Sequence, residues 1–61
     1  MANIWKRIPW EFPIDGQEVW VRRMDFWDSF SATWDESATE FVIEEGYRIP
    51  WYEISRWKVR V

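Results

Sequence analysis

Histidine, cysteine and leucine are all absent from this chain of 61 residues, which also contains only two glycines. Without cysteine the chain forms no disulfide and offers no thiolate to a metal, and without histidine it lacks the commonest nitrogen ligand of zinc. Structural zinc, haem and iron–sulfur sites are therefore not expected, and we predict neither a metal nor a cofactor. Two glycines are also too few for a glycine-rich phosphate loop.

Long apolar runs and strong basic charge are lacking as well. No stretch approaches 18 consecutive apolar residues, so no membrane-spanning helix is predicted, and the first seven residues lack the apolar centre of a signal peptide. Eleven acidic residues against eight basic ones give a net charge of −3, whereas a protein that wraps duplex nucleic acid is strongly basic. The sequence thus predicts a cytoplasmic protein whose partners are neither membranes nor duplex nucleic acid.

Aromatic residues dominate what is present, with seven Trp, four Phe and two Tyr. The length sets a single domain over 1–61, and so small a domain has too little interior to hide seven indoles. We expect Trp5, Trp34 and Trp57 to pack in the core and leave Trp10 and Trp51 undecided. The remaining indole surface predicts self-association, with a homodimer as the expected form.

Alternating apolar and polar residues predict a mainly β fold, a small antiparallel meander of three to four strands. Two prolines four residues apart exclude a helix over 1–16, so this segment is predicted to be an extended arm laid over the core. At most a short helical turn is expected near Pro50. Strands are predicted at 17–24, 26–34, 39–45 and 55–61.

The pattern resembles a group of short uncharacterised proteins that are often found in phages and prophages. That group begins with a Trp a few residues before a Pro, continues with a Gly and a Val-x-Val strand, and ends with a Trp near the C-terminus. The resemblance implies a compact β-rich fold, a phage origin and hence a host cytoplasm, and it implies no chemistry. The matching residues are Trp5, Pro9, Gly16, Val19, Val21, Trp34 and the run Ile54-Ser55-Arg56-Trp57.

Catalytic groups are sparse. A serine nucleophile needs a base, and with no histidine only two lysines are left to serve. Carboxylate pairs occur, such as Asp25 with Asp28 or Asp35 with Glu36, but acidic residues in loops are usually solvated. We therefore predict a protein that is not an enzyme, with carboxylate-dependent catalysis as the third choice.

One predicted surface combines indoles with guanidinium groups. Indoles stack on planar molecules, and arginine binds phosphate through paired donors, so this surface suits a small anionic nucleotide-like ligand that the protein sequesters. Arg48 and Trp51 are expected to form a rim around it. The predicted ligand-binding residues are Trp20, Arg22, Trp27, Arg48, Trp51 and Arg56.

Two other interpretations stay open. Lys58 and Arg60 can pair across strands with Glu40 and Glu44, an arrangement common on any antiparallel sheet, and Trp20 and Trp27 can be covered by the N-terminal arm or by a second copy. The aromatic face can also dock on a phage or host protein, with Trp, Tyr and Arg as hot spots. This protein-interaction module is the alternative function.

Overall fold

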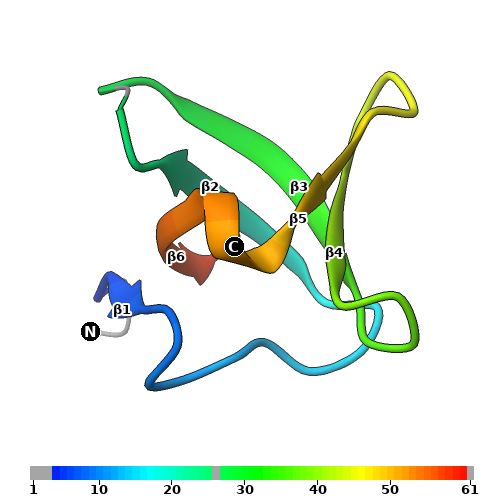
Figure 1. Ribbon diagram of the computed structural model, residues 1–61, viewed down its shortest axis with the longest axis horizontal. Helices are drawn as coiled ribbons and strands as arrows, with labels where there is room; N and C mark the ends of the chain where they lie inside the picture. The colour runs from blue at the N-terminus through cyan, green and yellow to red at the C-terminus, as the bar shows by residue number, and fades with distance from the viewer. Residues whose placement is uncertain (1–3, 26, 61) are drawn as a thin grey trace.

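The protein is described from a computed structural model that covers residues 4–25 and 27–60. Within these residues the chain forms one antiparallel sheet with the strand order β1-β6-β2-β3-β4-β5 (Figure 1). A single 3-10 turn, η1, precedes the last strand. The elements are β1 Lys6–Arg7, β2 Glu18–Arg23, β3 Ser29–Asp35, β4 Glu40–Ile43, β5 Arg48–Pro50, η1 Trp51–Glu53 and β6 Ile54–Val59.

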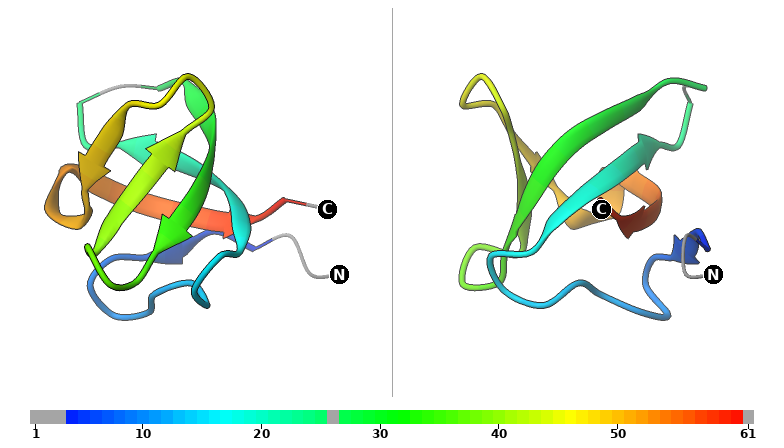
Figure 2. Two further views of the ribbon diagram at one scale, coloured as in Figure 1. Left: turned by 90° about the vertical axis from the view of Figure 1, so that its right-hand side faces the viewer. Right: turned by 180° about the vertical axis from the view of Figure 1, so that it is seen from behind.

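The four strands from β2 to β5 form a meander, in which each strand pairs with the next. Three of them correspond to the predicted strands 17–24, 26–34 and 39–45, whereas the fourth predicted strand, 55–61, is not part of this meander. The last strand departs from this order. After η1 the chain returns across the molecule, and β6 lies between β1 and β2 (Figure 2). The sheet is strongly twisted and curls around its inner side (Figure 2). Both edge strands, β1 and β5, are short.

The core lies on the inner face of this curled sheet, where alternate residues of the strands point toward one another. Phe41 faces Trp34 across β3 and β4 with ring centroids 4.6 Å apart, and Trp57 faces Val21 across β6 and β2. The prediction that Trp34 and Trp57 are core residues is confirmed, at 3% and 2% exposure. The buried cluster is Val19, Val21, Ala32, Trp34, Phe41, Ile54 and Trp57.

The predicted number of strands was too low, since six are present. The two missed strands, β1 and β5, have two and three residues, too short for an alternating pattern to be recognised. Proline is compatible with β5 because this strand is an edge, where a missing N–H breaks no pairing. Phe26, the first residue of the predicted strand 26–34, and Val61, the last residue of the predicted strand 55–61, lie outside the described residues. The same holds for residues 1–3 of the predicted arm.

The N-terminal arm covers the core only in part. Its backbone carbonyl at Glu11 accepts a hydrogen bond of 2.8 Å from the indole Nε1 of Trp57, and Pro13 is buried. Trp10, however, is 79% exposed, and Ile4 is also exposed. The arm therefore seals one end of the core while presenting apolar side chains to solvent.

Candidate functional site

Three arginines lie in one row across three neighbouring strands on the outer face of the sheet. Arg56 of β6 stands opposite Arg7 of β1 on one side and opposite Arg22 of β2 on the other. Residues opposite each other have Cβ atoms about 4.5–5.5 Å apart, and like charges in such positions are destabilising. None of the three makes an ion pair with any residue that the structure describes.

Trp5 lies beside this row, between two cations. The Cζ atom of Arg22 is 4.7 Å from the ring centroid of Trp5, and Nζ of Lys58 is 4.8 Å from it. The prediction that Trp5 is a core residue is wrong: both of its cations are on the outer face, and the ring is only half-buried. Cation–π contacts stabilise the indole there without core packing.

A depression of about 320 Å³ opens next to the arginine row and includes three of the six predicted binding residues: Arg22, Trp27 and Arg56. Trp27 is 88% exposed, so the alternative in which the N-terminal arm covers it is wrong. The Nε atom of Arg22 is buried and has no hydrogen-bond partner among the described residues, so this guanidinium keeps unused donor capacity. The rest of the lining is Arg23, Met24, Asp25 and Ser55.

The other predicted binding residues lie elsewhere. Trp20 shares the outer face but does not line the depression, because Lys58 and Ser31 are its neighbours across the strands. Arg60 takes the position over its ring, 5.4 Å from the centroid. Arg60 also pairs with Glu18 at 3.7 Å, so the expected pairing of Lys58 and Arg60 with Glu40 and Glu44 is wrong.

Arg48 does not form a rim to this site, since it is held by carboxylates at the opposite edge of the sheet. Its Nη1 atom lies 3.0 Å from Oδ2 of Asp35 and 3.3 Å from Oε1 of Glu40. The hydrogen bond from Arg48 holds the pKa of the Asp35 carboxyl below its usual value, and Asp35 in turn raises the pKa of Arg48. Trp51 is also remote, against Phe12 and Tyr52.

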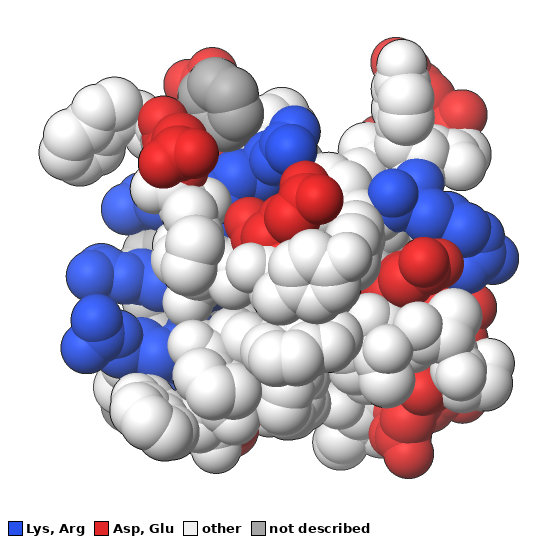
Figure 3. Space-filling model, viewed as in Figure 1, with Lys and Arg blue, Asp and Glu red and all other residues white. Residues whose placement is uncertain are grey.

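Lys and Arg side chains gather at the left of Figure 3, the side of β1, while the right-hand side carries acidic side chains together with a second basic group. A chain with a net charge of −3 therefore has one locally basic face. An anion that approaches this face meets positive potential at short range.

Sequence reasoning missed Arg7, which belongs to the arginine row, and Trp5, which lies beside the row. The signal was the spacing of Trp5 and Arg7, which are two residues apart and so share one face of an extended chain. Pro9 concealed it, because a proline close by favours an irregular arm over a paired strand.

Acidic side chains within residues 4–25 and 27–60 are the candidate metal ligands and include a predicted carboxylate pair. No group of three or more His, Cys, Asp or Glu side chains there is placed to hold a metal ion. In the Asp35 and Glu36 pair, Asp35 is occupied by Arg48, by the Ser37 hydroxyl at 2.8 Å and by the Ala38 amide. In the same residues no helix is long and apolar enough to cross a bilayer.

No protein family, no curated protein and no solved structure matches the chain. The function is therefore argued from the arginine row, the depression beside it and the exposed indole of Trp27.

Proposed function

We propose that this protein is a non-enzymatic binder that sequesters a small, nucleotide-like anion. The phosphate lies on the arginine row formed by Arg7, Arg56 and Arg22. The planar part of the ligand stacks on Trp27, at the edge of the same depression.

The observation that carries the proposal is the row of three arginines, none of which forms an ion pair with a described carboxylate. Three like charges side by side cost stability in the free protein. A bound phosphate offsets this repulsion, because each guanidinium offers paired N–H donors that match the phosphate oxygens.

Trp27 supports a planar partner for the phosphate. At 88% exposure its ring is open to stacking, and stacking of a base on an aromatic side chain contributes about 1–3 kcal/mol. The depression of about 320 Å³ lies at the small end of the range of ligand pockets, about 300–1,000 Å³. A mono- or dinucleotide therefore suits the site better than a long polymer.

The test is calorimetric titration of the protein with adenosine and guanosine mono-, di- and cyclic phosphates, with inorganic phosphate alone as a further ligand. We expect Trp27→Ala to weaken nucleotide binding by about 1–3 kcal/mol and to leave binding of inorganic phosphate unchanged. Trp10→Ala is the matched control, since Trp10 is similarly exposed but lies on the arm. Equal binding by the two variants contradicts the stacking role.

The arginine row is tested separately with Arg56→Lys. Lysine keeps the charge but loses the paired donors, so we expect weaker binding of both nucleotide and inorganic phosphate. Arg48→Lys is the control, because Arg48 is held by Asp35 and Glu40 away from the row. If Arg56→Lys binds phosphate as tightly as the unmodified protein, or if the affinity does not fall with added salt, phosphate does not bind at the arginine row.

A protein-interaction module is the second candidate, and the exposure of Trp27 and Tyr52 favours it. Both side chains lie near the turn after β2, and Trp and Tyr are the side chains most often found as hot spots. The two candidates differ in one measurement. The interaction module is the better assignment if titration with nucleotides gives no heat of binding and if heat denaturation of the purified protein releases no material that absorbs at 260 nm.

A further inference from the structure

A second cavity lies away from the basic face, at the end of the molecule where β3 turns into β4. Its volume is about 350 Å³. Five residues line it: Phe12 from the N-terminal arm, Trp34 from β3, Glu36 and Thr39 from the turn between β3 and β4, and Trp51 from η1. The lining thus consists of three aromatic residues, one glutamate and one threonine, whose hydroxyl donates a hydrogen bond of 2.6 Å to the Ala38 carbonyl.

The rings form walls that meet at an angle. Phe12 lies 5.5 Å from Trp34, with the ring planes inclined by 31°, and 5.8 Å from Trp51, with the planes inclined by 75°. The Trp51 amide donates a hydrogen bond of 3.1 Å to the Thr39 carbonyl, which fixes η1 against the turn. The cavity is therefore held by backbone contacts between segments far apart in the sequence.

No cation of this chain occupies these rings. The indoles of Trp5, Trp20 and Trp57 each have a Lys or Arg of the chain over the ring. In the part of the chain that the structure describes, no Lys or Arg lies over the rings of Phe12 or Trp51. The exposed parts of the Phe12 and Trp51 rings are thus available to a cation from outside, whereas Trp34 is buried between Phe12 and Phe41.

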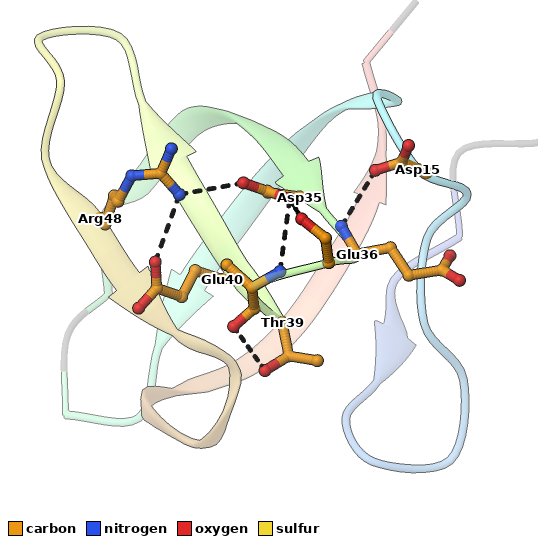
Figure 4. Close-up of polar contacts among 8 residues, drawn as sticks. Asp15, Asp35, Glu36, Thr39, Glu40 and Arg48 are labelled. Atoms are coloured by element: carbon orange, nitrogen blue, oxygen red, sulfur yellow. Dashed lines mark hydrogen bonds and ion pairs between the residues drawn. The ribbon is translucent and has the colours of Figure 1, made fainter.

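The charges around the cavity are also negative. The Glu36 carboxylate makes no hydrogen bond or ion pair with the described residues, while its backbone amide donates to Oδ1 of Asp15 at 3.0 Å. Figure 4 shows its side chain pointing away from the Arg48 cluster. Arg48, the cation in that view, is engaged by Asp35 and Glu40. Arg48 therefore does not neutralise the charge of Glu36.

We propose that this cavity binds a methylated ammonium group. A primary ammonium needs several hydrogen-bond acceptors when it leaves water, and the cavity offers one carboxylate and one hydroxyl. A methylated ammonium spreads the same charge over apolar surface, so aromatic walls replace its hydration at little cost. The group is carried either by a free small molecule of the choline type or by a methylated lysine side chain.

The first test compares tetramethylammonium chloride with 3,3-dimethylbutan-1-ol, a neutral molecule whose tert-butyl group has the shape of a trimethylammonium group, and uses sodium chloride as the control for ionic strength. Binding is followed by NMR through the indole N–H signals of Trp34 and Trp51. We expect tetramethylammonium to bind about tenfold or more tightly than the alcohol, because only the cation gains from the ring faces and from Glu36. Equal affinities, or shifts no larger than those given by sodium chloride, overturn the proposal.

The second test uses variants at the cavity wall. Glu36→Gln removes the charge and Phe12→Leu removes a ring face while keeping an apolar side chain, and we expect each to weaken tetramethylammonium binding several-fold. Glu44→Gln and Trp27→Ala are the matched controls, since both residues are exposed and lie outside the cavity. If the controls weaken binding as much as the wall variants, the ammonium binds elsewhere and the assignment fails.

The source of the ammonium is assigned by a third titration, with choline and with a short peptide in trimethyllysine and unmodified lysine forms. Tighter binding of the trimethyllysine peptide than of choline assigns the site to a protein side chain, and the reverse order assigns it to a small molecule. Tighter binding of the unmodified lysine peptide than of its trimethylated form contradicts the chemistry proposed here.

Discussion

Trp5, which directly precedes β1, and Trp57 of the neighbouring strand β6 differ in the kind of contact that holds them. Trp57 is buried on the inner face, and its Nε1 atom donates to the Glu11 carbonyl at 2.8 Å. Trp5 lies on the outer face between Arg22 and Lys58. The same residue type is thus a core residue in one place and a platform for cations in the other.

This difference predicts different costs of truncation. Trp57→Ala is expected to lower the free energy of unfolding by about 3–5 kcal/mol, as for a large buried side chain. Trp5→Ala should cost about 1–2 kcal/mol, the sum of two partly exposed cation–π contacts. Urea unfolding followed by circular dichroism measures both. Equal losses in the two variants contradict the outer-face position of Trp5.

The ion pair between Asp35 and Arg48 predicts a pH dependence. The pKa of Asp35 is lowered in the folded protein, chiefly by the hydrogen bond from Arg48. Its contribution to stability is therefore complete above the ordinary aspartate pKa and is lost as the pH falls through the lowered one. We expect Arg48→Met to raise the pKa of Asp35 in an NMR titration. An unchanged pKa in that variant contradicts the pairing.

Among the elements, the turn between β4 and β5 depends on the backbone of Gly46. Its φ angle is +94°, and a Cβ atom built there meets nothing within 4 Å. Gly46→Ala is therefore expected to destabilise the fold by about 1–2 kcal/mol through the backbone alone. Gly46→Asn should cost less, because asparagine tolerates positive φ better. Thermal unfolding of the two variants measures the difference, and a neutral Gly46→Ala contradicts this turn geometry.

The strand β6 shows how pattern and pairing separate at the scale of elements. Its alternation of Trp57 and Val59 with Arg56 and Lys58 predicted the inner and outer faces correctly. Its neighbours were not contained in that pattern, because every strand of a meander alternates in the same way. The return of β6 to lie beside β1 created the arginine row.

At the scale of the molecule, exposed apolar side chains favour self-association. Large apolar patches are rare on monomeric proteins, and a chain of 7.6 kDa has little surface over which to disperse such residues. We expect sedimentation at micromolar concentration to show a species of twice the chain mass. Trp10→Ser should shift it toward the monomer, and a monomer in the unmodified protein contradicts the expectation. The exposed residues are Ile4, Trp10, Phe12, Ile14, Met24, Trp27, Tyr47 and Tyr52.

The sequence by itself determined the β class, the faces of four strands and the core positions of Trp34 and Trp57, because these follow from a period of two residues and from side-chain size. Only the tertiary structure decided which residues meet. Arg22, Trp27 and Arg56 come together, while Arg48 and Trp51 lie elsewhere. The reason is physical: alternation assigns a residue to a face of its own strand, but the order of strands in the sheet decides its neighbours on that face.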